Sequence, residues 1–143
     1  MKDLKLETKI LFLNELKSHE QVEKNRLEAL TKEIKEDGIL KKAIAVDAKN
    51  LIIIDGHHRV EALKILGYKK VPVCLFNYNS PLIEIYSFDG GKGISKEEVI
   101  KAALAGRKFP PRTTKHMVRL DNGSLVHISE LEDNVNIPLE NLL

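Results

Sequence analysis

Apolar runs and helical repeats alternate in the first third of the chain. The run TKILFLNEL at 8–16 contains four consecutive apolar residues and predicts a strand. Apolar residues then recur at the spacing of one helix face, at Leu27, Leu30 and Ile34. Gly38 stands where a helix C-cap belongs, and Ser18 with Gln21 has the spacing of a capping box. We therefore expect a strand and then a helix that ends at Gly38.

The middle of the chain predicts three further strands and a short helix. The apolar runs at 43–47 and 51–54 are separated by a polar turn and read as two strands. The second run, LIII, has no alternation, so we expect it to be buried on both faces. Residues 57–66 have a helical pattern that ends at Gly67, and VPVCLFNY at 71–78 predicts the next strand.

A weaker strand signal and a strong helix signal follow. Residues 82–88 alternate only loosely between apolar and polar and predict a strand. The segment 95–106 predicts a helix, because Ser95 and Glu98 have the spacing of a capping box and a glycine closes the pattern.

The last third of the chain predicts a hairpin and then loses its pattern. Residues 116–128 contain Asn122-Gly123, a strong two-residue turn signal between two apolar runs. The tail at 129–143 indicates no clear element. No linker or repeat divides the sequence, so we expect one α/β (α+β) domain over 1–143, with a small mixed sheet and helices.

Composition excludes several classes of protein. The chain has 143 residues, of which 43% are hydrophobic and 31% charged, as is typical of a globular domain. A net charge of +2 argues against a dedicated nucleic-acid surface, which is strongly basic. Cys74 is the single cysteine, so a disulfide framework is excluded. No signal core and no apolar run of ~18 residues is present, so we expect a cytoplasmic protein without membrane contact. The many lysines and glutamates hint at a thermophile.

The junction between the buried run and the helix carries the candidate chemistry. Asp55, Gly56, His57, His58 and Arg59 follow four apolar residues directly. A helix N-terminus presents free N–H groups and partial positive charge, and glycine lets an anion approach. Arginine adds a fork of donors that matches phosphate oxygens. The set therefore favours a phosphate site, with the aspartate available for a metal or a hydroxyl.

Two other interpretations of this junction stay open. An aspartate before a helix is often its N-cap, and histidine and arginine are common on protein surfaces. Zinc is a second possibility, because the chain has five histidines. Neighbouring His57 and His58 diverge in direction, however, and no HExxH or CxxC spacing is present. The concentration of four polar functional groups after a buried strand favours a functional site.

Three motifs together resemble a known family. DGHHR in its strand–helix context, over residues of about 8 to 78, resembles the ParB/sulfiredoxin-like superfamily. The upstream pair His19-Glu20 and the later PPRTTKH are most similar to free L-serine kinases, which phosphorylate the serine hydroxyl to give O-phospho-L-serine. Sulfiredoxins need a cysteine in the GxxR loop, and chromosome-partitioning ParB proteins carry a helix-turn-helix domain; this chain has neither. A ParB-like nucleotide- or DNA-binding module, or a nuclease, remains the alternative.

The resemblance implies roles for particular residues. It implies that Glu20 and Asp55 are the two catalytic acids, of which Glu20 orients or deprotonates the serine hydroxyl. The implied phosphate-binding loop is Gly56, His57, His58 and Arg59. The implied serine-binding residues are Thr113, Thr114 and His116. The pathway that such phosphoserine would serve, cysteine biosynthesis or serine breakdown, stays open.

The phosphoryl donor is the last expectation. Phosphoryl transfer needs stabilisation of spread negative charge, so we expect Mg²⁺ bridging donor oxygens with few protein ligands. Family members use ADP, ATP or inorganic pyrophosphate. The chain has no tryptophan and few aromatic residues for an adenine slot, which favours pyrophosphate. Lys92, or Arg112 and Lys115, would then neutralise a second phosphate.

Overall fold

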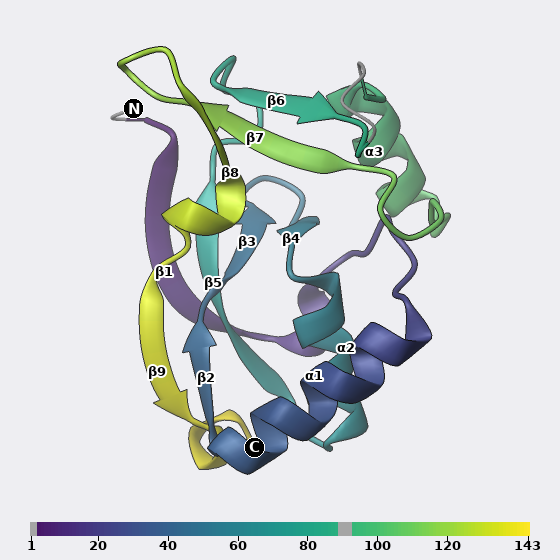
Figure 1. Ribbon diagram of the computed structural model, residues 1–143, viewed down its shortest axis with the longest axis vertical. Coiled ribbons are helices and arrows are strands. Elements are labelled where there is room, and N and C mark those ends of the chain that lie inside the picture. Colours follow the sequence, from purple (N-terminus) through teal and green to yellow (C-terminus); the bar gives the residue numbers. More distant parts are fainter. Residues whose placement is uncertain (1–2, 89–92) are drawn as a thin grey trace.

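The computed structural model describes residues 3–88 and 93–143. Its largest sheet contains β1 (Lys5–Phe12), β3 (Ile44–Asp47), β4 (Ile53–Asp55) and β5 (Lys70–Phe76), in the order β1-β5-β3-β4 (Figure 1). β3 runs parallel to β5, whereas β1 and β4 are antiparallel to their neighbours. The expectation of a small mixed sheet is confirmed.

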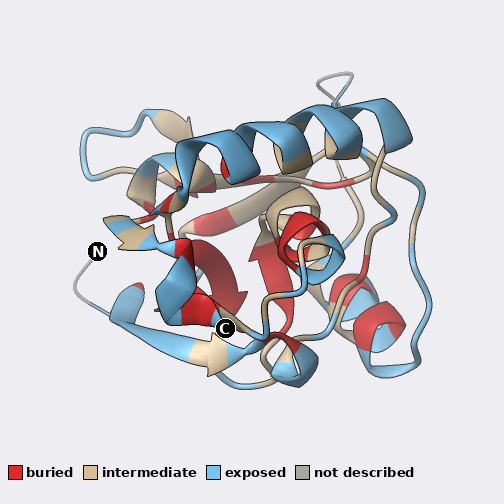
Figure 2. Ribbon diagram, turned by 90° about the horizontal axis from the view of Figure 1, so that it is seen from below, coloured by how far each residue is buried: buried red, intermediate tan, exposed pale blue. Residues whose placement is uncertain are grey.

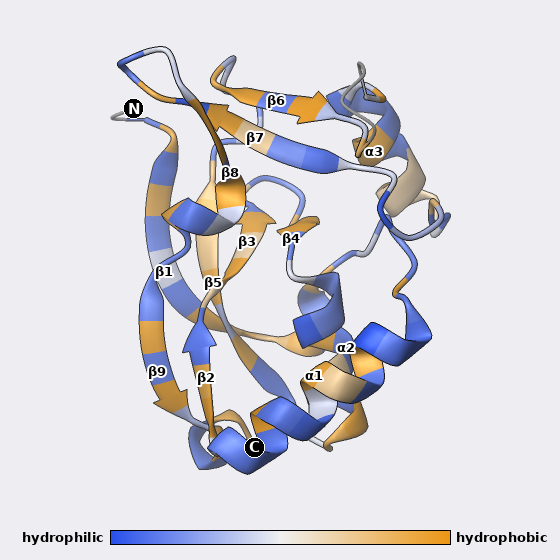
Figure 3. Cartoon of the chain, viewed as in Figure 1, coloured by the Kyte–Doolittle hydropathy of each residue, from blue (hydrophilic) through white to orange (hydrophobic). Residues whose placement is uncertain are grey.

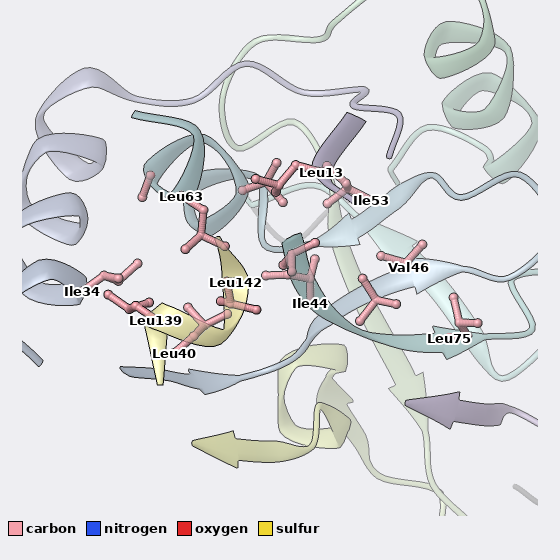
Figure 4. Packing of buried hydrophobic residues seen from close by; sticks show 14 residues of the cluster. Leu13, Ile34, Leu40, Ile44, Val46, Ile53, Leu63, Leu75, Leu139 and Leu142 are labelled. Atoms are coloured by element: carbon pink, nitrogen blue, oxygen red, sulfur yellow. The ribbon is translucent and has the colours of Figure 1, made fainter. Parts of the chain in front are cut away.

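This sheet separates two apolar clusters because side chains alternate across a strand. Ile44 and Val46 of β3 belong to one cluster, whereas Ala45 belongs to the other. Ile53 and Ile54 likewise lie on opposite sides, so the prediction that LIII is buried on both faces is confirmed. Figure 4 shows the first cluster, which gathers the odd-numbered apolar positions of β5 with leucines from α2 and the tail.

Two helices cover the first cluster. α1 (Lys24–Asp37) and α2 (His57–Ile65) pack against each other, and α1 exposes most of its surface (Figure 2). Gly38 ends α1 in the left-handed conformation, as predicted. The predicted capping box at Ser18 and Gln21 is wrong. Glu23 caps α1 instead, because its carboxylate accepts hydrogen bonds from the amides of Asn25 and Arg26.

The second cluster is covered by a three-stranded sheet and a helix. β6 (Ile83–Tyr86), β7 (Lys115–Arg119) and β8 (Leu125–His127) form the sheet in that order, and α3 (Lys96–Leu104) lies beside it (Figure 1). The Ser95–Glu98 capping box is confirmed. The β7–β8 hairpin is confirmed as well, with Gly123 at a φ of 87° in its turn.

The tail is ordered where the sequence indicates no element. It forms the 3-10 turn η2 (Ile128–Leu131), the strand β9 (Asn134–Pro138) and the turn η3 (Leu139–Leu142). β9 pairs with β2 (Ile39–Lys42), a strand that the sequence pattern also missed. The first strand is likewise shorter than predicted, since η1 (Leu13–Glu15) follows β1.

Hydrophilic residues make up much of α1, whereas β3 and the middle of β5 are mainly hydrophobic (Figure 3). Among residues 3–88 and 93–143, no helix combines the length and the apolar character that crossing a membrane requires.

Candidate functional site

One cavity collects most of the residues that the motifs single out. It has a volume of about 620 Å³ and is bordered by α1, β2, the start of α2 and part of β7. The predicted site residues that line it are Glu20, Asp55, Gly56, His57, His58, Arg59, Thr114 and His116. Thr113 is absent from this lining. Residues almost a hundred positions apart in the chain therefore meet at one site.

Gly56 permits the tight connection between β4 and α2. Its φ is 114°, and a Cβ placed there would lie 2.7 Å from Ile44 Cδ1 and 3.1 Å from Arg59 Nη2. A side chain would thus be strained and would displace the neighbours. No side chain caps α2, so its first amides are left for an anion at the cavity.

The guanidinium of Arg59 is held from several sides within the protein. Nη1 donates to the carbonyl oxygens of Lys42 and Ala43 at 3.3 and 3.2 Å. Nη2 donates to Asp55 Oδ2 at 3.0 Å and to Glu132 Oε1 at 2.9 Å. The phosphate-binding role expected for Arg59 stays a prediction, and both terminal nitrogens of its guanidinium already have acceptors within the protein. A phosphate that approached these two nitrogens would compete with the acceptors inside the protein.

Glu132 is the site residue that the sequence pattern did not reveal. Its side chain is 1% exposed and also accepts a hydrogen bond from the amide of Ala45 at 3.0 Å. Burial raises the pKa of Glu132 to about 9, Arg59 opposes this rise and Asp55 adds to it. No sequence signal marks Glu132, because it lies in the patternless tail.

The two histidines of the junction act as acceptors inside the protein. Nε2 of His58 accepts from the amide of Glu23 at 3.0 Å, which ties the residue before α1 to the first turn of α2. Nε2 of His57 accepts from the amide of His19 at 3.4 Å. Burial lowers the pKa of both imidazoles. Neutral His57 and His58 therefore hold the loop that precedes α1 rather than present two positive charges.

Three buried imidazoles meet behind the cavity. The ring centroid of His19 lies 4.6 Å from that of His57 and 5.9 Å from that of His116. Burial lowers the pKa of His19 to about 4 and that of His116 well below its usual value. The hydroxyl of Tyr78 lies 2.7 Å from Nε2 of His116. His116 lines the cavity. Its position in this cluster fits a structural role better than direct contact with a charged ligand.

Glu20 is fixed by the segment that contains the two threonines. Its Oε1 accepts hydrogen bonds from the amide of Thr113, the amide of Thr114 and the Thr114 hydroxyl, each at 3.0 Å. Burial raises the pKa of Glu20, while these hydrogen bonds lower it. The Thr113 hydroxyl donates to the Pro110 carbonyl. Thr113 thus positions Glu20 through the backbone amide of Thr113. The Thr113 side chain instead bonds within the 109–116 segment.

Residues outside the DGHHR motif add to the positive charge of Arg59 at the cavity. The basic residues in the lining, besides Arg59, are Arg26, Lys41, Lys42 and Arg112. Arg112 also lies 4.9 Å from the ring centroid of Phe88, and Lys115 lies 6.0 Å from it. Lys92, the other residue expected to neutralise a phosphate, lies outside the described residues.

An apolar wall completes the cavity. It consists of Ala29, Leu30, Ile34, Ile39 and Leu40, from one face of α1 and from β2. The expectation that the chain lacks a slot for adenine did not take this wall into account, because the wall combines residues of two elements. Within residues 3–88 and 93–143, no cluster of three or more histidine, cysteine or acidic side chains is arranged to hold a metal ion.

Sequence comparison finds relatives that are named L-serine kinases. The chain is 34% identical over 77 residues to an ATP-dependent L-serine kinase of Staphylothermus marinus, and this covers 51% of the chain and 31% of the relative. It is 32% identical over 80 residues to an ADP-dependent L-serine kinase of Thermococcus kodakarensis, covering 53% and 33%. The matched region therefore spans about a third of the length of these curated relatives.

Comparison of structures supports the same relationship at the level of the fold. A free serine kinase in complex with AMP superimposes with a TM-score of 0.80 at 17% identity, covering 97% of this chain and 95% of that one. The model of the ParB N-terminal domain matches residues 3–86, a region that contains Glu20, β4 and the DGHHR junction. The chain belongs to the ParB N-terminal domain family, and part of its sequence is similar to curated L-serine kinases.

Proposed function

We propose that the protein transfers a phosphoryl group from ATP or ADP to the hydroxyl of free L-serine, giving O-phospho-L-serine. One observation carries the proposal: Glu20, Asp55 and the uncapped start of α2 line the same cavity. Phosphoryl transfer needs an oriented hydroxyl, a place for the transferred phosphate and stabilisation of its charge. The cavity has a candidate group for each need.

A nucleotide is the donor that the site supports best. The expectation of pyrophosphate rested on the lack of an apolar slot, and the wall formed by α1 and β2 removes that reason. A cavity of about 620 Å³ is of the size that holds a small organic ligand. The names of the curated relatives likewise include ATP and ADP and give pyrophosphate no support.

The transferred phosphate would lie against the first amides of α2. Gly56 leaves this approach open, and the helix dipole favours negative charge at this end. Arg26 and Arg112 can approach the remaining phosphates, because both are exposed and line the cavity. Arg59 would stabilise the charge of this phosphate while it stays bound to Asp55 and Glu132.

Glu20 would receive the serine hydroxyl. Its Oε1 is occupied by the threonine segment, which leaves Oε2 as the less committed oxygen for the substrate. A pKa raised by burial makes this carboxylate a better general base than an exposed one. Thr114 would fix the direction of the carboxylate in the same step.

Asp55 is the residue that would hold Mg²⁺. It is a half-buried carboxylate that lines the cavity, and Mg²⁺ bound to phosphates commonly needs only one or two protein carboxylates. When bound, the ion would neutralise charge on the donor oxygens.

The test is to supply serine and Mg²⁺ with ATP, ADP or pyrophosphate and to detect O-phosphoserine by mass spectrometry. We expect product with a nucleotide and none with pyrophosphate alone. Glu20→Gln should lower kcat by about 10²- to 10⁴-fold, because the general base is lost. Glu28→Gln is the matched control, since Glu28 is exposed on α1 outside the cavity.

Two outcomes would count against the proposal. Product with pyrophosphate as the sole donor would overturn the choice of nucleotide. Nucleotide binding without phosphoserine from any donor would instead favour a ParB-like binding module, whose affinity Glu20→Gln should leave unchanged.

A further inference from the structure

Three ionisable side chains form a compact unit beneath the start of α2. Arg59 Nη2 lies 3.0 Å from Asp55 Oδ2, 2.9 Å from Glu132 Oε1 and 3.0 Å from Glu132 Oε2. The side chains of Arg59, Asp55 and Glu132 are 17%, 27% and 1% exposed. Exposure thus decreases from Asp55 through Arg59 to Glu132, and all three residues line the cavity.

The unit is anchored to the strand next to β4. Glu132 Oε2 accepts from the amide of Ala45, and Ala45 is the residue paired with Asp55 between β3 and β4. Arg59 Nη1 donates to the carbonyl oxygens of Lys42 and Ala43, just before the same strand. The guanidinium is therefore fixed in both position and rotation.

We propose that Glu132 is a positioning residue of the phosphoryl site, which sets the Arg59 guanidinium and, through it, Asp55. The inference rests on the proposed function and assigns to it a residue from the C-terminal tail. Glu132 does not contact the reacting atoms in this proposal. It acts through Arg59, whose other acceptor, Asp55, faces the cavity.

A purely structural role does not account for a buried carboxyl group at Glu132. A buried ion pair costs desolvation, and well-packed apolar residues in its place are often neutral or stabilising. Glu132 instead directs both carboxylate oxygens to Arg59 and to the strand partner of Asp55.

The first experiment compares the kinetics of Glu132→Gln with those of wild type. We expect kcat to fall on the order of 10- to 100-fold, the usual effect of losing a supporting group behind a site, with KM for serine little changed. The melting temperature should stay equal or rise. Ile128→Val is the matched control, because Ile128 is fully buried in the adjoining turn η2 and outside the cavity; it should lose stability and keep kcat.

A double-mutant cycle with Arg59→Lys separates positioning from a general effect on the fold. If Glu132 acts through Arg59, Glu132→Gln should have almost no further effect on kcat in the Arg59→Lys background. Independent, multiplicative effects of the two substitutions would overturn the proposal.

The geometry is also testable without activity. In wild type, we expect slow rotation of the Arg59 guanidinium in side-chain ¹⁵N NMR, and Glu132→Gln should release it. Equal rotation rates in the two proteins, or unchanged kcat in Glu132→Gln, would overturn this inference. A wild-type protein that forms no phosphoserine would instead overturn the proposed function, and the NMR comparison would still decide whether Glu132 fixes Arg59.

Discussion

At the scale of single residues, the site depends on backbone position as much as on chemical groups. Gly56 is needed because no side chain fits between Ile44 and Arg59 at its φ of 114°. At Arg59, by contrast, the residue type alone does not reveal the contacts that are made. Its residue type suits phosphate, but its actual acceptors are two carboxylates and two carbonyl oxygens. What a side chain can bind and what it does bind are thus separate questions at this junction.

Substitution of Gly56 tests the first of these statements. Gly56→Ala should lower the free energy of unfolding by about 2–4 kcal/mol, since strain of the left-handed conformation adds to displacement of Ile44. Gly38→Ala is the control: Gly38 has a φ of 69°, but a Cβ added there would meet no atom within 4 Å, so strain alone should cost about 1–2 kcal/mol. Equal losses in urea unfolding would show that the contact with Ile44 is unimportant.

At the scale of elements, the loop before α1, the start of α2 and β7 are joined by buried imidazoles. His19, His57 and His116 come from these three places and contact one another. Their pKa values are all lowered by burial, so the folded protein keeps them neutral. Lys96 and Lys108 lie near enough to lower these pKa values further.

This cluster predicts loss of stability in mild acid. An unfolded histidine takes up a proton as pH falls below about 6.5, whereas folded His19 stays neutral until about 4. The unfolded chain therefore binds more protons in this window, and His19 alone should lower the free energy of unfolding by about 2 kcal/mol between pH 7 and 5. Urea unfolding across this range measures the slope, and His19→Gln should reduce it. Stability that stays constant down to pH 5 would contradict the prediction.

At the scale of the whole molecule, the tail closes both the core and the site. Leu139 and Leu142 belong to the first apolar cluster, β9 pairs with β2, and Glu132 reaches Arg59. The family match ends at residue 86, yet the segment at 109–116 and the tail supply contacts to Glu20 and Arg59. The site is therefore assembled from nearly the full length of the chain.

Removal of the tail tests this dependence. A variant that ends at His127 should fail to fold, because burying two leucine side chains contributes several kcal/mol and the loss of Glu132 removes one of the two acidic partners of Arg59. Circular dichroism and urea unfolding measure the effect. Removal of Leu143 alone is the control, since that residue is 67% exposed and its loss should change little. A cooperative transition in the variant that ends at His127 would contradict this view of the tail.

Much of the fold was predictable because its signals are local. The capping box at Ser95, the turn at Gly123 and the αL cap at Gly38 each depend on neighbours within four residues. The apolar runs likewise predicted the strands of the main sheet. β2 and β9 were missed because each is short and half-buried, and their pairing joins segments almost a hundred residues apart.

The sequence by itself determined the strands of the central sheet, the helices and the family, and its motifs predicted Glu20, Asp55 and Gly56 as site residues, which line one cavity. These conclusions follow from periodicity and from motifs, which are properties of neighbouring residues. Only the tertiary structure decided the partners of Arg59, the position of Glu132 beside it, the neutral histidine cluster and the apolar wall of the cavity. Each of these depends on burial or on contact between distant segments, and neither quantity is written in the local pattern of the chain.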